Sequence, residues 1–265
     1  MRALALALAA AASVACGVPL AKLPEGPGVT APDIAAAMVE AFRGCNAVKT
    51  LTAEIGVSGS AGGHRLRARL LAGFAAPSAR LEAVAPVGAP FFIFVATGTD
   101  ATLLLPRDDR ALEHGRSDAV LEAIAGVRIG PSELLRTLTG CAMPDRLTNP
   151  LAFGDTWRTG AGEGGGKVYL HRESPSAPWT VATVLHSGDA LQWDWRADYS
   201  DFHQGLPYRI HLVSRDTRRF DLQLTLSQVE TGVLLASNVF RVQIPASAVP
   251  ITLEELRRSG PLGSK

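Results

Sequence analysis

The chain has 265 residues, of which 47% are hydrophobic, and its 26 Lys and Arg residues nearly balance its 25 Asp and Glu residues. A net charge of +1 offers no overall electrostatic attraction to nucleic acid, so no nucleic-acid partner is expected. The hydrophobic content is sufficient for a substantial core. The part of the chain after residue 16 suits one domain, because sheet-rich domains often exceed about 200 residues.

The N-terminus has the pattern of a secretory signal. An early positive charge at Arg2 precedes an apolar run over residues 3–12, and small residues then lead to Cys16. The apolar run is shorter than the ~20 residues that a spanning helix needs. Residues 1–15 are therefore predicted to be a cleaved signal peptide.

The motif Ser13-Val14-Ala15-Cys16 resembles the bacterial lipobox, whose cysteine is diacylated and becomes the mature N-terminus. Two or three acyl chains, such as palmitate, would hold the protein on a membrane. By resemblance to the known sorting rule, Gly17 in place of Asp indicates the outer membrane, with the protein facing the periplasm. The alternative is cleavage of an ordinary signal peptide, in which case Cys16 is not lipidated. No later segment is long and apolar enough to span a bilayer, so the anchor is the only predicted membrane attachment.

The remaining chain divides into a tether, one domain and a tail. Residues 16–31 comprise the lipidated cysteine and a Gly- and Pro-rich segment without periodicity, which predicts a flexible tether. Residues 32–258 are predicted to form a single domain, and residues 259–265 a flexible tail. Asp33 could cap a first helix that ends near Gly44.

The period of the hydrophobic pattern changes to two after the first helix. Residues 51–57 alternate apolar and polar side chains, which predicts a strand with one solvated face, and residues 60–63 are typical of a hairpin turn. The next strand carries Arg65, Arg67 and Arg69 on one side. A solvated face is the preferred interpretation of this stripe, and an anion-binding stripe is the alternative.

Residues 79–97 predict a hairpin around a Pro-Val-Gly-Ala-Pro break. Pro86 and Pro90 lack amide donors, so they interrupt the strand ladder, and Gly88 permits a tight turn. Val87 would then lie at the tip, where polar residues are usual. From the pattern alone, Val87 is expected to fold back under the loop, and the membrane anchor predicted at the N-terminus favours an outward-facing tip instead. Residues 91–95 are apolar on both faces, so one face must line a core or cavity and the other must be covered by protein or contact lipid.

Two short amphipathic helices are expected in the middle of the chain. Ser117 is a candidate N-cap for a helix that ends at Gly126, and a second helix runs from Pro131 to Gly140. Strand patterns resume after Pro150, the first over residues 153–158 and the last over residues 239–244. The predicted fold is α+β and mainly β: an incomplete, open antiparallel β-barrel of about ten strands, whose short helices cover a hydrophobic cavity.

Apart from Cys16, the chain has only Cys45 and Cys141. In an oxidising compartment these thiols could form one disulfide that ties two helices together. The sequence alone does not establish that their Cα atoms come close enough, so the unpaired state remains the alternative.

The sequence offers no convincing catalytic constellation, metal site or cofactor site. The glycine-rich residues 160–165 resemble a dinucleotide-binding pattern, but a strand rather than a helix follows them. The six histidines have no paired metal-ligand spacing, and no Gly-x-Ser-x-Gly elbow occurs. Asp194, Asp198 and Asp201 lie near Trp193, Trp195 and Tyr199, which is typical of a polar strand edge with aromatic packing; a carbohydrate site is the alternative. The protein is therefore not expected to be an enzyme.

The segment of residues 50–141 resembles LolB, an outer-membrane lipoprotein that receives other lipoproteins from the periplasmic carrier LolA. The matching positions are Pro86, Val87, Gly88, residues 126–131, Leu134, Leu135 and Gly140. The resemblance implies an incomplete barrel with helices that close a hydrophobic cavity for acyl chains. In that family, a protruding leucine in a Pro-Leu-Gly loop passes lipoproteins into the membrane, and Val87 would take this role here.

We therefore expect a monomeric, outer-membrane-anchored lipoprotein that binds acylated lipoproteins or lipid, with a LolA-like carrier as a partner. A structural or assembly lipoprotein with a filled core is the runner-up, and a hydrolase is a distant third. The candidate cavity residues are Leu81, Phe92, Phe94, Leu103, Leu105, Ile124, Leu134 and Leu138.

Overall fold

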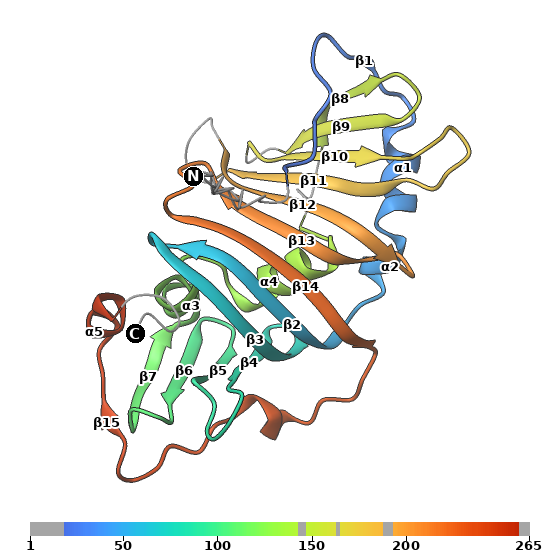
Figure 1. Ribbon diagram of the computed structural model, residues 1–265. Helices are drawn as coiled ribbons and strands as arrows, with labels where there is room; N and C mark the ends of the chain where they lie inside the picture. Colours follow the sequence, from blue (N-terminus) through green and yellow to red (C-terminus); the bar gives the residue numbers. More distant parts are fainter. Residues whose placement is uncertain (1–18, 143–146, 163–164, 188–192, 260–265) are drawn as a thin grey trace, which may run out of the picture.

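The computed structural model describes residues 19–142, 147–162, 165–187 and 193–259 (Figure 1). The predicted signal peptide and Cys16 thus lie outside the described residues, as does most of the predicted tail. The elements in chain order are β1 (Val29–Thr30), α1 (Ile34–Ala41), α2 (Arg43–Asn46), β2 (Thr50–Ala61), β3 (His64–Ala75), β4 (Ser78–Val84), β5 (Phe92–Thr97), β6 (Asp100–Leu105), β7 (Arg110–Arg116), α3 (Ser117–Ala125), α4 (Pro131–Thr139), β8 (Leu147–Phe153), β9 (Trp157–Gly162), β10 (Lys167–His171), β11 (Thr180–Ser187), β12 (Trp193–His203), β13 (Leu206–Ser214), β14 (Phe220–Thr231), the 3-10 helix η1 (Ser237–Phe240), β15 (Val249–Pro250) and α5 (Leu253–Arg258).

The strands form one long, curved sheet in the order β1-β8-β9-β10-β11-β12-β13-β14-β2-β3-β4-β5-β6-β7-β15. Neighbouring strands are antiparallel, except that β15 pairs with β7 in parallel. The pairing of β14 with β2 joins an early and a late meander into one sheet. The predicted open antiparallel architecture with short helices is confirmed. The described residues contain fifteen strands rather than about ten, partly because two-residue strands are added at the edges.

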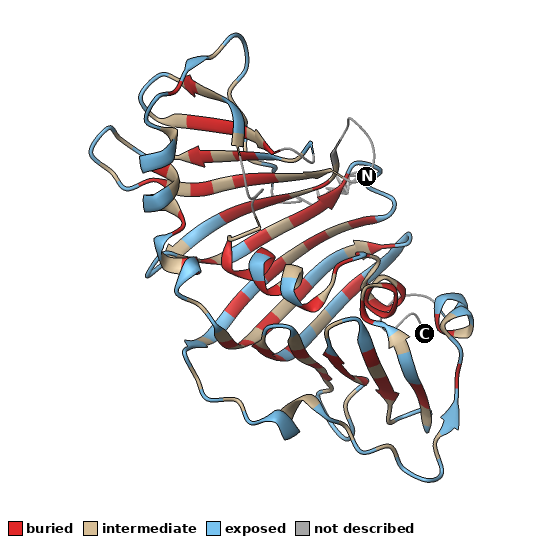
Figure 2. Cartoon of the chain, turned by 180° about the vertical axis from the view of Figure 1, so that it is seen from behind, coloured by how far each residue is buried: buried red, intermediate tan, exposed pale blue. Residues whose placement is uncertain are grey.

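The sheet has an inner face, which α3 and α4 cover, and an outer face on the opposite side (Figures 1 and 2). Along β2, the alternation predicted from the sequence places Leu51, Ala53, Ile55 and Val57 in the buried core. The same core includes buried side chains of α3 and α4. The apolar inner face thus packs against the helices, as an amphipathic helix on a sheet requires.

The C-terminal strap, residues 233–250, covers the outer face at one end of the sheet. Its 3-10 helix lies beside β4 and β5, and Arg80 donates hydrogen bonds to the carbonyl oxygens of Val239 and Arg241. Residues 239–244, which have a strand pattern, are therefore not in the sheet. Outward-facing Val95 and Leu104 are buried. Both faces of β5 are thus covered by protein at this end of the sheet, one of the outcomes that its sequence allowed.

The predicted tether contacts the domain at Ala21 and, through β1, at residues 29–31. The Ala21 amide donates to Asp198 Oδ2 at 2.7 Å, and Arg196 Nη2 donates to the Ala21 carbonyl at 2.5 Å. Asp198 Oδ1 also accepts hydrogen bonds from Thr183 and from Arg196 Nε. We call these four residues the N-terminal latch. Asp198 is buried, and a buried carboxylate needs such donors, so the chain is fixed at Ala21 rather than free as far as residue 31.

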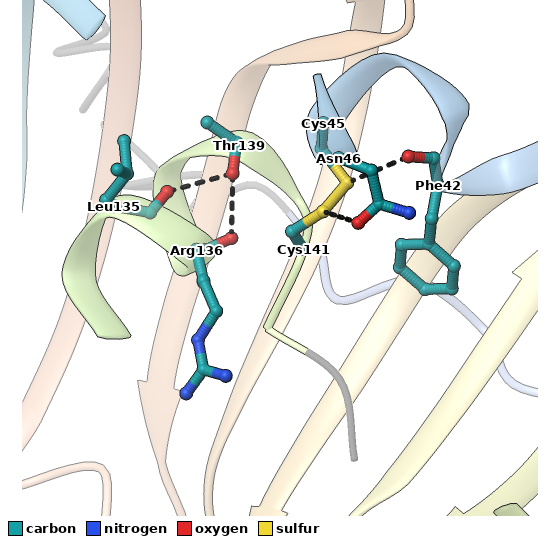
Figure 3. Close-up of a disulfide and its surroundings, with 7 residues drawn as sticks. All are labelled: Phe42, Cys45, Asn46, Leu135, Arg136, Thr139 and Cys141. Atoms are coloured by element: carbon teal, nitrogen blue, oxygen red, sulfur yellow. Dashed lines mark hydrogen bonds between the residues drawn. A yellow bond between two sulfur atoms is a disulfide. The ribbon is translucent and has the colours of Figure 1, made fainter. Parts of the chain in front are cut away.

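A disulfide joins Cys45 of α2 to Cys141, which follows α4 (Figure 3). The Cα atoms of the two cysteines are 5.7 Å apart, within the range of ordinary disulfides. Gly140 ends α4 in a left-handed conformation with φ of 76°, which turns the chain toward Cys45. The bond therefore ties the C-terminal end of α4 to the N-terminal helical pair.

Candidate functional site

The candidate cavity residues come together on the inner face. Leu81, Phe94 and Leu103 occupy directly paired positions on β4, β5 and β6, so they form one apolar row across the sheet. All three are buried. Phe92, Ile124 and Leu138 are also buried, and Leu105 and Leu134 pack against the same cluster from partly buried positions. In the structure, these side chains form part of one packed apolar cluster.

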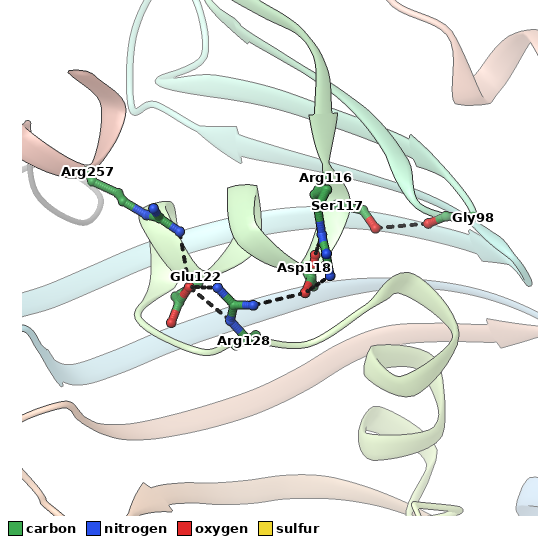
Figure 4. Close-up of polar contacts among 7 residues, drawn as sticks. All are labelled: Gly98, Arg116, Ser117, Asp118, Glu122, Arg128 and Arg257. Atoms are coloured by element: carbon green, nitrogen blue, oxygen red, sulfur yellow. Dashed lines mark hydrogen bonds and ion pairs between the residues drawn. The ribbon is translucent and has the colours of Figure 1, made fainter. Parts of the chain in front are cut away.

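The helix α3 is placed over this cluster by its sequence at both ends. Ser117 is the first helical residue rather than the N-cap, because its hydroxyl donates to the Gly98 carbonyl at 2.9 Å instead of to its own helix (Figure 4). Gly126 ends the helix with φ of 76°, and a Cβ at this position would lie 3.0 Å from Ala61 Cβ. Glycine is thus required by both conformation and space, and α3 packs closely on the sheet.

Ion pairs hold α3 in place on its exposed side (Figure 4). Glu122 accepts two hydrogen bonds from Arg128, at 3.1 and 2.9 Å, and pairs with Arg257 of α5 at 3.5 Å. Asp118 pairs with Arg116 and Arg128. The hydrogen bonds from Arg116 lower the pKa of Asp118, and those to Glu122 raise the pKa of Arg128. The network therefore links α3, the loop after it and the C-terminal helix.

The helix α4 is attached at both of its ends by contacts with distant parts of the chain. Glu133, in its first turn, lies 3.0 Å from His186 Nε2 of β11. The His186 ring stacks on Trp195 of β12, with ring centroids 4.7 Å apart. The disulfide at Cys141 holds the other end. The sequence gives His186 no metal-ligand spacing, and the structure gives it this partner on α4.

The hairpin loop between β4 and β5 presents an apolar tip. Val87 is 85% exposed and Phe91 is 42% exposed. Gly88 has φ of 83°, a left-handed conformation that suits glycine, and no atom lies within 4 Å of where its Cβ would be. Pro86 precedes Val87 in this loop. The side chain of Val87 therefore points outward rather than folding back under the loop.

Arg107 supports this loop from the turn between β6 and β7. Its Nε donates to the Ala89 carbonyl at 2.9 Å, and its Nη2 donates to the Val87 carbonyl at 3.0 Å. Its guanidinium carbon lies 4.1 Å from the centroid of the Phe91 ring. The sequence around Arg107 gives no local sign of this role. The available signal was topological, because alternate turns of an antiparallel meander lie at the same edge of the sheet.

The other residues considered for nucleotide or carbohydrate binding have structural roles in the sheet. Gly160 lies on β9, paired with Val168 of β10, as in a hairpin rather than a nucleotide-binding turn. The Asp198 carboxylate belongs to the N-terminal latch, and Asp201 pairs with His203 and Arg209. Burial raises the pKa of the Tyr199 hydroxyl. Among the residues that the structure describes, no group of His, Cys, Asp and Glu could hold a metal ion, and no helix is long and apolar enough to cross a membrane.

Comparisons with known proteins identify the fold class. A LolA superfamily protein from Nitrosomonas europaea matches with a TM-score of 0.54 and 15% identity, over 81% of this chain and 98% of the other. A DUF1329 family protein from Desulfovibrio piger matches with a TM-score of 0.53 and 11% identity, over 78% of this chain and 97% of the other. No protein-family model and no curated protein sequence matches the chain. The chain thus has a LolA-like fold, and at these identities the likeness concerns the fold alone.

Proposed function

We propose that the chain is a non-catalytic lipoprotein of the cell envelope that binds acyl chains or other hydrophobic ligands on the inner face of its open sheet. The observation that carries this proposal is the apolar row of Leu81, Phe94 and Leu103 on adjacent strands, of which the short helix α4 contacts β4 and the short helix α3 contacts β6. Binding of this kind needs no covalent chemistry or cofactor. Burial of apolar surface supplies ~25 cal/mol per Å², so an acyl chain that replaces helix contacts can be held reversibly.

In its most specific form, the proposal is a LolB-like receptor. A lipid on Cys16 would anchor the protein to the outer membrane, facing the periplasm, and a LolA-like carrier would deliver acylated lipoproteins. The exposed Val87 loop supports this form, since an apolar tip can enter a membrane while the domain stays outside. We expect the receptor to act as a monomer.

Native mass spectrometry tests the proposal on residues 17–265, which contain every residue that the structure describes. We expect an acylated ligand to co-purify or to be taken up from a loaded carrier. The Val87→Glu variant should retain that ligand but fail to release it to liposomes. Val39→Glu is the matched control, because Val39 is also exposed, at 68%, but lies on α1. Absence of a ligand, together with no uptake from the carrier, would refute the binding proposal.

One observation favours a second candidate, a structural or assembly lipoprotein with a filled core. The candidate cavity residues already belong to one packed cluster. On that interpretation α3 and α4 are permanent parts of the core rather than covers that give way to a ligand. The same mass spectrometry separates the two, because a filled core takes up nothing from the carrier.

A further inference from the structure

The Val87 loop combines an apolar tip with a positive charge. Val87 and Phe91 are exposed, and the Arg107 guanidinium lies between the loop carbonyls and the Phe91 ring. A guanidinium has five N–H donors, and the loop carbonyls accept from its Nε and Nη2 atoms, so donors remain for another acceptor. The loop thus presents hydrophobic and cationic groups side by side.

The charge of Arg107 is not neutralised by an ion pair within the described part of the chain. The next two arginines along the chain do form ion pairs: Arg110 pairs with Glu255, and Arg116 pairs with Asp118. The neighbouring Asp108 is exposed, and its backbone amide donates to the Leu105 carbonyl. Arg107 is therefore available to an external anion, with one carboxylate beside it in the sequence.

We propose that Arg107 makes the loop selective for membranes that contain anionic phospholipids. Val87 and Phe91 enter the boundary between headgroups and acyl chains, and the free edge of the guanidinium binds a headgroup phosphate. Planar N–H pairs match phosphate oxygens, and a basic residue near an anionic surface contributes about 1 kcal/mol. The hydrogen bonds to the Val87 and Ala89 carbonyls give Arg107 a second task, because they fix the direction in which Val87 points.

This inference rests on the proposed membrane contact of the loop. Liposome binding tests the contact and the selectivity for anionic lipid separately. The probes are vesicles of phosphatidylcholine alone and vesicles of equal parts phosphatidylcholine and phosphatidylglycerol, with residues 17–265 as the protein. We expect about fivefold tighter binding to the anionic vesicles, and a loss of this preference at high salt. No binding to either vesicle would refute the membrane contact itself. Equal binding to both would leave that contact intact and overturn the selectivity.

Variants assign the preference to Arg107. Arg107→Gln should bind both vesicles alike, and Arg107→Lys should keep most of the preference, because it keeps the charge. Asp108→Asn should increase the preference, since it removes the adjacent negative charge. Arg110→Gln is the matched control and should behave as the parent protein. A preference that survives in Arg107→Gln, or that Arg110→Gln loses equally, would overturn the proposal. Thermal unfolding of each variant verifies that the domain is folded.

Discussion

The helices α3 and α4 cover the same face of the sheet, but they are held by different kinds of contact. The helix α3 packs on the nearby strands β6 and β7, and its ion pairs involve its own flanking residues and α5. The helix α4 lies over the middle of the sheet, against β4 and β13. Its fixed points are a disulfide to α2 at one end and a histidine of β11 at the other.

The difference indicates which helix can move without the other. Local ion pairs on a protein surface are individually weak, but they re-form readily because their partners stay close. The long-range attachments of α4 connect it to parts of the chain that are distant in sequence, so their loss frees a whole end of the helix. If one helix yields to an acyl chain, we expect it to be α4, pivoting on the disulfide. Four predictions test this comparison.

The largest effect is expected from removal of the disulfide. The double variant Cys45→Ser/Cys141→Ser opens a link between residues 96 positions apart. Constraint of a loop of this length contributes about 3 to 5 kcal/mol to stability. We expect a corresponding loss in the free energy of unfolding, measured with denaturant, and faster amide exchange in α4 than in α3. A reductant should reproduce the effect in the parent protein and add nothing in the double variant. Equal acceleration in both helices would contradict the comparison.

A smaller effect is expected for α3. Glu122→Gln removes the charge that pairs with both Arg128 and Arg257. These side chains are partly exposed, at 28% to 51%, so we expect a loss of about 1 kcal/mol. Amide exchange should accelerate in α5, which depends on Arg257, and remain unchanged in α4. Acceleration in α4 instead would show that the two helices are coupled.

The attachment at the start of α4 is expected to be weaker still. Glu133→Gln keeps a hydrogen-bonding group near His186 but removes the charge. We expect a loss of about 0.5 kcal/mol, and an increase in exchange limited to the first turn of α4. A Glu40→Gln substitution on α1 is the control, since no ion pair involves Glu40 among the described residues. An effect spread over the whole of α4 would argue against the disulfide as the pivot.

The smallest effect concerns pH. Hydrogen bonds from Arg116 lower the pKa of Asp118 below its ordinary value of 3.8. A lowered pKa contributes stability that is complete above the unfolded-state pKa and is lost as pH falls through the folded-state pKa. Asp118→Asn should therefore be less stable than the parent protein by under about 0.5 kcal/mol near neutral pH. The difference should shrink as the pH falls below about 4. Chemical unfolding across this range measures it, and a constant difference would contradict the assignment.

The sequence predicts the local parts of this structure well. Alternation along residues 51–57 and 79–84 gives the correct buried faces, and the two prolines around Val87 mark a loop. These features depend on neighbours in the chain. They are therefore present in the pattern itself. The exposure of Val87 at the tip of the loop is not the outcome that the pattern alone favours.

Contacts between distant residues were not predictable in the same way. Nothing near Ala21 indicates that Asp198 and Arg196 bind its backbone, and nothing near Arg107 indicates that it supports the next hairpin loop. Residues 153–158, expected as one strand, are divided between β8 and β9 by a turn at Gly154, where φ is 58°. Residues 239–244 of the strap have a strand pattern but lie outside the sheet, where Arg80 donates to the Val239 and Arg241 carbonyls. In each case the deciding partner is remote in sequence.

The N-terminal latch sets the reach of the molecule. On the proposal that Cys16 carries the lipid, only five residues of chain separate the membrane from the fixed point at Ala21, and they span at most about 18 Å. With the latch open, the next fixed point is Val29 of β1, and the chain between Cys16 and this point can extend to about 45 Å. With the latch closed, the outer face of β12 would be held close to the bilayer. With the latch open, the domain could rotate and move farther from the bilayer surface. The ion pair of Arg196 and Asp198 would then decide which surfaces the Val87 loop can touch.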